Sequence, residues 1–260
     1  MKVAIPSMTG SVPLDKKLAD MESQLQLEIL PQPDETTCGP TCLQAVYRYY
    51  GDEIPLETVI AESGKLEEGG TLAVLLGCDA LRRGYRATIY TYNLQVFDPT
   101  WFGPEARDTI DLGERLRAQD EAKRLPKLHV ATEAYLEFLE RGGRLYFEDL
   151  TPSLIRKYLR RGTPILSGLS ATFLYRSARE RSDNELDDVG GEPVGHFVLL
   201  SGYHPDSRQV LIADPLLPNP MADGQRYLVD IDRVVGAILL GVVTYDANLL
   251  IVDAPRKRKR

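Results

Sequence analysis

The chain of 260 residues contains only three cysteines, Cys38, Cys42 and Cys78. An odd and low count in a chain of this length excludes a fold held together by a disulfide framework. Free thiols persist in a reducing compartment, so the count favours a cytoplasmic protein with a thiol available for chemistry. Histidine is equally sparse, with three in the chain, so few side chains can serve as a base near neutral pH.

Long hydrophobic runs are also missing. Membrane spans need ~20 mostly apolar residues. The longest apolar-rich stretch, residues 234–245, is shorter and is interrupted by Gly236 and Gly241. At the N-terminus, Pro6 and Gly10 break a short apolar run before the core of a secretory signal could form. We therefore expect a soluble, cytoplasmic protein without a membrane partner.

Positive charge is not in excess. The 31 Lys and Arg residues are outnumbered by 38 Asp and Glu residues, which gives a net charge of −7 at pH 7. An acidic body argues against nucleic acid as the main partner. The strongly basic stretch is the C-terminal tail, residues 251–260, which we expect to be a solvated tail.

The order of the patterns predicts an α+β fold. Helical spacing dominates the first two-thirds of the chain and strand patterns dominate the last third. We expect an N-terminal extension at 1–29, a catalytic domain at 30–250 with an insertion at about 95–130, and the basic tail at 251–260. The extension shows a short strand pattern at 3–5 and helical spacing over 14–27. Helices are predicted at 40–50, 56–63, 72–83, 112–127, 132–140 and 152–161, and strands at 87–92, 145–147, 164–170, 197–203, 209–213, 227–230 and 237–245.

Cys38 is the predicted nucleophile. It lies in the segment Gln-Pro-Asp-Glu-Thr-Thr-Cys-Gly-Pro-Thr-Cys-Leu, at a Gly-Pro turn that opens an apolar helix. The start of a helix favours the thiolate, which is the nucleophilic form of cysteine. Gln32, six residues upstream, could donate an N–H to a developing oxyanion together with the backbone N–H of Cys38. Cys42 lies one helical turn further on and is expected to be a buried structural residue.

His196 and Asp214 are the predicted base and the residue that orients it. His196 directly precedes the predicted strand 197–203. The other two histidines are less suitable: His204 follows that strand in a turn that we expect to be exposed, and we expect His129 to lie in a linker. Asp214 directly follows the predicted strand 209–213. If the two strands pair antiparallel, His196 and Asp214 come almost opposite each other, and the carboxylate could accept from the imidazole N–H.

A zinc site is the alternative for the cysteines. Cys38 and Cys42 are four residues apart, and His196 could supply a third ligand. The pair lacks the usual C-x2-C spacing, and the chain offers no second ligand pair. We therefore expect neither a metal nor another cofactor.

These motifs resemble those of the C39 and C39-like cysteine peptidases. The resemblance rests on Gln32, on Cys-Gly-Pro-Thr-Cys-Leu from Cys38, on Gly-His-Phe-Val-Leu-Leu around His196 and on Ala-Asp-Pro at Asp214, and it spans about residues 30–245. It implies a papain-like fold, with the nucleophile helix packed on an antiparallel sheet from the C-terminal part. It also implies Gln32 as oxyanion donor, Cys38 as nucleophile, His196 as base and Asp214 as orienting residue. The best-known members are fused to membrane ABC exporters, which this chain does not resemble, so a stand-alone member is expected.

The expected activity is hydrolysis of a peptide or small amide substrate through a thioester on Cys38. An acyltransferase would use the same thioester but resolve it with an amine. Acidic side chains in the loop 176–193, before His196, could serve such an amine: Glu180, Asp183, Glu185, Asp187 and Asp188. A third alternative is a non-catalytic binding domain that keeps the fold, and it predicts an unreactive Cys38.

Overall fold

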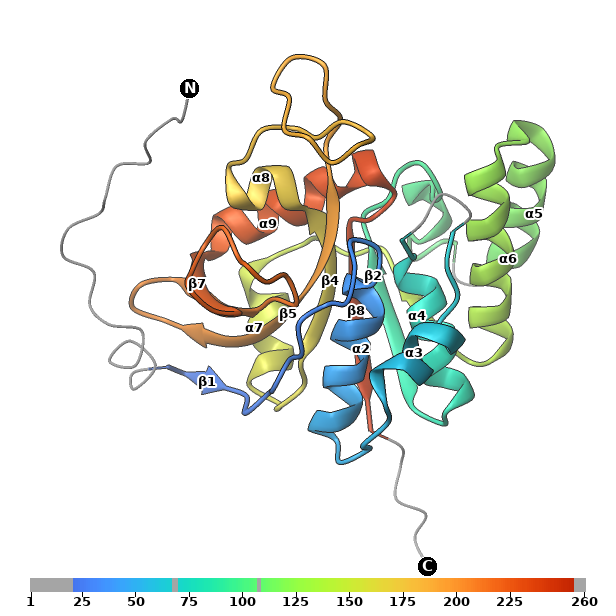
Figure 1. The fold of residues 1–260 in the computed structure, drawn as a ribbon. Coiled ribbons are helices and arrows are strands. Elements are labelled where there is room, and N and C mark those ends of the chain that lie inside the picture. The colour runs from blue at the N-terminus through green and yellow to red at the C-terminus, as the bar shows by residue number, and fades with distance from the viewer. Residues whose placement is uncertain (1–20, 67–69, 107–108, 255–260) are drawn as a thin grey trace, which may run out of the picture.

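The computed structural model describes residues 21–66, 70–106 and 109–254 (Figure 1). Amphipathic patterns with Pro or Asp at several helix starts form the helices α2 (Cys38–Tyr49), α3 (Leu56–Glu62), α4 (Ala73–Arg82), α5 (Leu112–Lys123), α6 (Pro126–Glu140), α7 (Pro152–Leu159), α8 (Ala171–Tyr175) and α9 (Ile231–Leu240), with the 3-10 turns η1 (Pro99–Trp101) and η2 (Gly241–Thr244).

Strands from distant parts of the chain form one sheet. They are β1 (Ser23–Gln24), β2 (Arg86–Thr91), β3 (Arg144–Tyr146), β4 (Ile165–Ser170), β5 (Gly195–His204), β6 (Gln209–Ala213), β7 (Arg226–Asp230) and β8 (Asn248–Asp253). The sheet order is β3-β2-β8-β4-β5-β6-β7, and β1 pairs with β5. The β2–β3 pair is parallel, and the other pairs are antiparallel.

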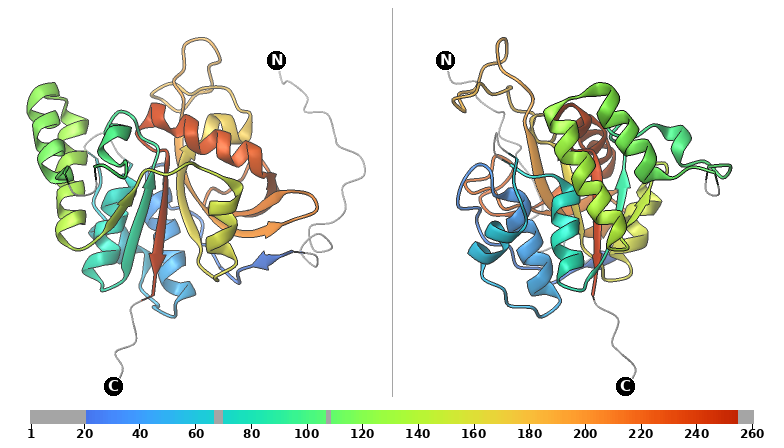
Figure 2. Two further views of the ribbon diagram at one scale, coloured as in Figure 1. Left: turned by 180° about the vertical axis from the view of Figure 1, so that it is seen from behind. Right: turned by 90° about the vertical axis from the view of Figure 1, so that its right-hand side faces the viewer.

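Helices cover both faces of this sheet, as the two views in Figure 2 show. The side chains of β5 alternate between two cores: Phe197 and Leu199 pack with α2 and α4, whereas Val198 and Leu200 pack with α7 and α9. The α+β class and the packing of the nucleophile helix on the antiparallel sheet are therefore confirmed.

The predicted strand 237–245 is wrong, because this segment belongs to α9 and η2. Its β-branched residues suggest a strand, but apolar residues recur at helical spacing from Ile231 onward and form one buried face. The Asp230 side chain caps the helix by accepting from the Asp232 N–H. The buried face of α9 consists of Ile231, Val234, Ala237 and Ile238.

The sheet continues past the expected domain boundary at residue 250. Strand β8 was not predicted, and it pairs with β2 as far as Asp253, opposite Arg86. Residues 251–253 therefore belong to the sheet and not to the basic tail.

The expected helix over 14–27 is wrong within the described residues. Ser23 and Gln24 form β1 against Tyr203 and Gly202, while the remainder of that pattern and the expected strand at 3–5 lie outside the described part. Glu22 forms an ion pair with Arg156 (N–O 2.8 Å) that holds this segment on the body.

The helical pair α5 and α6 differs from the prediction in its limits. Arg124 has a left-handed backbone (φ 52°) that ends α5. Pro126 then opens α6, so the segment expected to be a loop before residue 132 is helical.

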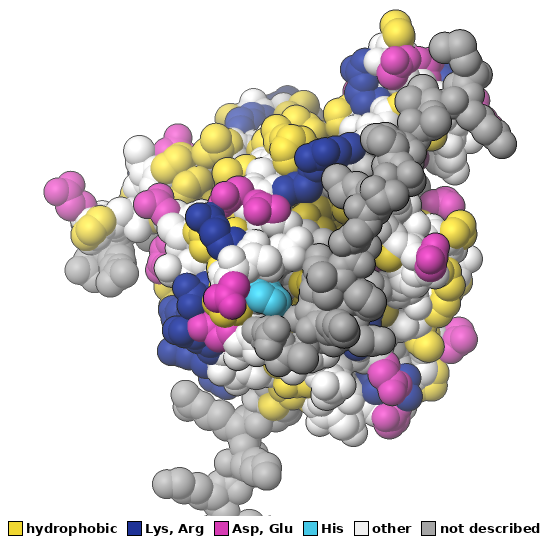
Figure 3. Space-filling view, turned by 90° about the vertical axis from the view of Figure 1, so that its left-hand side faces the viewer, with side chains coloured by type: hydrophobic (Ala, Val, Ile, Leu, Met, Phe, Trp, Pro, Cys, Tyr) yellow, Lys and Arg dark blue, Asp and Glu magenta, His cyan; other side chains and the backbone are white. Residues whose placement is uncertain are grey.

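Exposed hydrophobic side chains occur on α8 and α9. Phe173, Leu239 and Leu240 are about two-fifths exposed, at 39%, 44% and 43%. Figure 3 shows hydrophobic side chains gathered toward the top of one face of the molecule.

Within residues 21–66, 70–106 and 109–254, no helix combines the length and the apolar character that crossing a bilayer requires.

Candidate active site

Helix α2 begins at Cys38 itself. Thr37 is the N-cap residue, its side chain makes no capping hydrogen bond, and its carbonyl accepts from the Thr41 N–H. Pro40 has no N–H, and across the described residues the N–H groups of Cys38 and Gly39 have no acceptor. These unpaired donors leave partial positive charge at the thiol and a backbone N–H free for an oxyanion.

Gly39 allows the helix start to approach its neighbours closely. A Cβ at this position would lie 2.5 Å from Thr71 Cγ2, 3.1 Å from Leu76 Cδ1 and 3.2 Å from Phe197 Cδ2. Glycine at this position, which lies in the first turn of α2 and not in the expected separate Gly-Pro turn, therefore lets the helix start pack closely against Thr71, Leu76 and Phe197.

His196 and Asp214 are brought together by the β5–β6 hairpin. The strands pair antiparallel, with Leu199 opposite Ala213, as the sequence predicts. His196 Nε2 and Asp214 Oδ1 lie 2.8 Å apart. Because Nε2 faces Asp214, Nδ1 is left for the Cys38 thiol, which lines the same cavity as His196 and raises the pKa of the imidazole.

Asp214 is completely buried and held by several donors. Its Oδ1 also accepts from the Leu216 N–H at 2.9 Å, while Oδ2 accepts from the Tyr175 hydroxyl at 2.7 Å and the Tyr227 hydroxyl at 2.5 Å. The sequence analysis missed both tyrosines. Tyr227 could have been found, because it lies on a predicted strand that follows the strand before Asp214. No sequence pattern pointed to Tyr175.

The charges of His196 and Asp214 stabilise each other. Burial alone would lower the pKa of His196, but the charge on Cys38 and the bond to Asp214 outweigh it and raise the pKa to about 10. Burial alone would raise the pKa of Asp214, but the hydrogen bond and charge of His196 lower it to about 2. The arrangement therefore suits an imidazolium between a thiolate and a carboxylate.

Cys38 and His196 line one cavity of about 170 Å³. Glu35, Lys127 and Asp246 also line it, and the sequence analysis identified none of these three. Glu35 lies in the segment before Cys38, whereas Lys127 and Asp246 come from distant segments with no motif around them.

The acidic loop before His196 lines a different hollow. Glu180 and Asp187 are on its wall, and it meets the Cys38 cavity at Gly195. Asp183, Glu185 and Asp188 line neither space. The carboxylate buried beside the reactive pair is therefore Asp246 and not one from this loop.

Gln32 lies next to the Asp214 segment. Its backbone N–H donates to the Pro215 carbonyl at 2.9 Å, and its side-chain Nε2 donates to the Asp34 carbonyl at 2.9 Å. Gln32 is not among the residues that line the cavity of Cys38. One N–H of the Gln32 side-chain amide thus donates within the loop, and the second N–H has no acceptor among the described residues.

The other two cysteines are fully buried. Cys42 Sγ donates to the Phe197 carbonyl at 3.3 Å, and burial raises its pKa well above the ordinary value. Burial likewise raises the pKa of Cys78 to about 12. Neither Cys42 nor Cys78 is therefore suited to thiolate chemistry near neutral pH.

Neither of the other histidines reaches the cavity. His204 is buried, contrary to the expectation of an exposed turn, and its Nδ1 accepts from the Ser207 N–H at 3.3 Å. His129 lies in α6 and not in a linker, and its Nδ1 pairs with Asp120 at 2.6 Å. Among the described residues, no three His, Cys, Asp or Glu side chains gather as a metal site requires.

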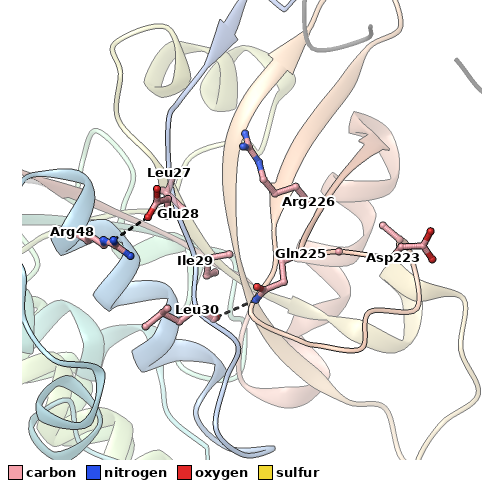
Figure 4. Close-up of a pocket in the computed structure, with 10 residues that line it drawn as sticks. Leu27, Glu28, Ile29, Leu30, Arg48, Asp223, Gln225 and Arg226 are labelled. Carbon is pink, nitrogen blue, oxygen red and sulfur yellow. Dashed lines mark hydrogen bonds and ion pairs between the residues drawn. The ribbon is translucent and has the colours of Figure 1, made fainter. Parts of the chain in front are cut away.

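A larger groove has a volume of about 740 Å³ and is lined by other residues (Figure 4). The extended segment 27–30 forms one wall and residues 222–226 form the other. Gln225 Nε2 donates to the carbonyls of Leu30 and Asp214, both at 3.1 Å. The groove wall therefore supports the backbone of Asp214, although the groove does not contain the thiol.

No protein-family model and no curated protein matches the chain. Among the solved structures that resemble it is a double glycine motif protease from an AMS/PCAT transporter in complex with the leader peptide, which is 14% identical, covers 90% of this chain and 96% of that chain, and has a TM-score of 0.41. The peptidase domain of Streptococcus ComA, a bi-functional ABC transporter, is 13% identical, covers 87% of this chain and 97% of that chain, and has a TM-score of 0.42. A protein from Bacillus anthracis described as a C39-like peptidase is 15% identical, covers 92% of this chain and 100% of that chain, and has a TM-score of 0.47. Since every TM-score is below 0.5, the chemistry has to be inferred from the geometry of the site.

Proposed function

We propose that this protein is a cysteine-dependent hydrolase that cleaves a peptide or amide bond in a cytoplasmic substrate. The supporting observation is the position of His196, which lies 2.8 Å from Asp214 and lines the same cavity as the Cys38 thiol at the start of α2. A nucleophile, a base and an orienting residue in this order form the minimal apparatus for thioester chemistry.

In the first half-reaction, the Cys38 thiolate attacks the carbonyl carbon of the substrate, and the carbonyl oxygen becomes an oxyanion. The free N–H of Cys38 and the second N–H of the Gln32 amide are the proposed donors to this oxyanion. When the oxyanion collapses, the C–N bond breaks and the His196 imidazolium gives its Nδ1 proton to the leaving amine.

In the second half-reaction, neutral His196 accepts a proton from water, and the resulting hydroxide attacks the thioester. The C–S bond breaks, the carboxylic acid leaves, and the thiolate–imidazolium pair is restored. Asp214, fixed by Tyr175 and Tyr227, keeps the imidazole in one orientation throughout.

Acyl transfer to an amine is the second candidate. It is favoured by one observation, the buried Asp246 carboxylate on the wall of the Cys38 cavity. A carboxylate there could hold an amine that resolves the thioester in place of water.

The test is alkylation with iodoacetamide across a range of pH, with the modified cysteine mapped by mass spectrometry. We expect selective labelling of Cys38 over Cys42 and Cys78, and slower labelling near neutral pH in His196→Ala. Incubation with model amides and acyl thioesters should then give hydrolysis or transfer products that are absent in Cys38→Ala.

Equal and slow labelling of all three cysteines would contradict the proposal and favour the non-catalytic binding domain. Thr41→Ser, a conservative change on the same helix, is a suitable control because its hydroxyl bond to Thr37 can be kept.

A further inference from the structure

Asp246 is a buried acid that the proposed mechanism does not use. It lies between η2 and β8 and is only 6% exposed, yet it lines the cavity of Cys38 and His196. The backbone on both sides is left-handed, with φ of 68° at Tyr245 and 66° at Ala247. Non-glycine residues adopt this conformation only when the surroundings impose it, and such positions cluster at functional sites.

The surroundings leave room for this carboxylate by using glycine. A Cβ at Gly195 would collide with Asp246 Oδ2, and a Cβ at Gly168 would lie 2.8 Å from Oδ1. Both glycines lie in strands, and Gly195 directly precedes His196. Glycine weakens a strand interior, so its presence at Gly168 is consistent with a requirement for the acid.

Few hydrogen bonds from the described residues offset the cost of burying the Asp246 carboxylate. Oδ2 accepts from the Thr244 hydroxyl at 2.9 Å, and Oδ1 has no hydrogen-bond partner there. Lys127, the nearby cation, directs its ammonium to the Thr244 carbonyl at 3.5 Å and the Tyr245 ring at 4.7 Å, without an ion pair to Asp246. Burial raises the pKa of Asp246 to about 7 and outweighs the positive charges of Lys127 and His196, which lower it. A ligand that supplies a further donor would offset this cost of burial.

The approach to Asp246 is also acidic. Glu35 lines the same cavity, and the adjoining hollow carries Glu180, Asp187 and Glu192. Burial and the charge of Glu35 raise the pKa of Glu180. Two cations also line this path, Arg181 (3.9 Å from Asp187) and Lys127, but the carboxylates outnumber them. A cationic group would therefore be attracted overall, whereas a substrate carboxylate would be repelled.

We propose that Asp246 binds an amine of the substrate, as its ammonium form, beside the carbonyl that Cys38 attacks. This inference rests on the proposed function, because it gives the cavity its reactive thiol. The amine belongs either to the acyl donor or to an amine that accepts the acyl group. In both cases Asp246 Oδ1 accepts the N–H. If the amine is the acceptor, it loses one proton to neutral His196 and one to solvent, its C–N bond forms and the C–S bond of the thioester breaks.

The test compares three small thiol reagents on the full chain at about pH 8, where Asp246, with a pKa raised by burial to about 7, is ionised. They are 2-aminoethyl (cationic), methyl (neutral) and 2-sulfonatoethyl (anionic) methanethiosulfonate. We expect the cationic-to-anionic rate ratio at Cys38 to fall about tenfold in the isosteric variant Asp246→Asn, with the neutral rate within about threefold. Glu180→Gln, which removes a similar charge at the path, should change the ratio much less.

A ratio unchanged in Asp246→Asn, or changed equally in Glu180→Gln, would overturn the inference and leave the proposed function intact. Slow labelling of Cys38 by the neutral reagent in the wild-type protein would instead overturn the proposed function, and the inference with it. If Asp246→Asn does not fold, the wild-type protein can be labelled in ethylammonium chloride and, separately, in sodium chloride at equal ionic strength. We expect ethylammonium to slow the labelling of Cys38 more than sodium does. Equal protection by the two salts overturns the inference.

The source of the amine is resolved with model thioesters. If it belongs to the acyl donor, wild-type protein should prefer a glycyl over an N-acetylglycyl thioester, and Asp246→Asn should lose this preference. If it belongs to the acceptor, added ethylamine should divert the acetylglycyl thioester to the amide in wild-type protein but not in Asp246→Asn. The absence of both effects would contradict the role of Asp246.

Discussion

The Cys42 thiol donates a hydrogen bond to the Phe197 carbonyl, with Sγ and O 3.3 Å apart. This bond joins the helix that carries Cys38 to the strand that carries His196. Cys42 is fully buried and, because burial raises its pKa, it remains a thiol at neutral pH. Cys42 therefore helps to fix the position of helix α2 relative to strand β5.

Replacing Cys42 by Ala should therefore affect both stability and reactivity. We expect a loss of about 1–3 kcal/mol in the free energy of unfolding, from the hydrogen bond and the volume removed. Alkylation of Cys38 should slow at least about threefold, because α2 can shift against β5. Urea unfolding and timed iodoacetamide labelling measure the two effects.

Cys78→Ala is the matched control, since Cys78 is equally buried and its Sγ donates to the Ala134 carbonyl at 3.4 Å, away from the site. It should be destabilised similarly but keep the Cys38 rate. Equal slowing in both variants would show that general loosening, and not the α2–β5 contact, controls the thiol.

Gly39→Ala should destabilise the start of α2. The added methyl group would lie 2.5 Å from Thr71 Cγ2, an overlap that costs about 1–3 kcal/mol in a packed region. Thr71→Ser removes this Cγ2 but retains the hydroxyl that donates to the Gly64 carbonyl. The double variant Gly39→Ala/Thr71→Ser should therefore recover part of the stability, as thermal unfolding can show. Strictly additive losses would mean that the two positions do not contact.

The sequence was sufficient for the parts of the site that depend on local pattern. A turn at 204–208 between two strand patterns predicts the hairpin. The hairpin brings His196 Nε2 to 2.8 Å from Asp214 Oδ1, although the register that pairs Leu199 with Ala213 does not place the two residues directly opposite each other. The Gly-Pro turn predicts the helix start at Cys38 in the same way. Short-range periodicity and turn chemistry therefore predict which groups come together in the candidate site.

The residues around them depend on tertiary contacts that no local pattern encodes. Asp246 reaches the cavity only because α9 and η2 return the chain to the sheet as β8, and this segment was predicted to be a strand. Tyr175 reaches Asp214 from 39 positions away in the chain. Both are placed by the packing of distant elements, so the pocket wall could not be derived before the fold was known.

Tyr227→Phe should weaken the protein mainly where Asp214 is charged. The Asp214 pKa of about 2, below its ordinary 3.8, means that its contacts add stability above pH 3.8, which is lost as the pH falls toward 2. Without the Tyr227 hydroxyl, the variant should lose about 1–3 kcal/mol at neutral pH, as for other hydrogen bonds to charged groups. Urea unfolding at several pH values should show this difference shrinking in acid.

Tyr49→Phe provides the comparison, because the Tyr49 hydroxyl donates to the neutral carbonyl of Gly162 at 2.9 Å. Its effect should not vary over the same acidic range. A Tyr227→Phe loss that stays constant with pH would mean that its hydroxyl does not stabilise the Asp214 carboxylate.

His196 should remain protonated well above neutral pH. Its pKa of about 10, raised from 6.5, means that its contribution to stability is complete below pH 6.5 and is lost as the pH rises through 10. The charge of Cys38 is the largest effect that raises it, so Cys38→Ala should lower the pKa by more than about one unit. NMR titration of ¹³C-histidine protein measures this directly, with His129→Gln and His204→Gln assigning the signals. A wild-type midpoint near 6.5, or one that Cys38→Ala leaves unchanged, would show that the thiolate–imidazolium pair does not form.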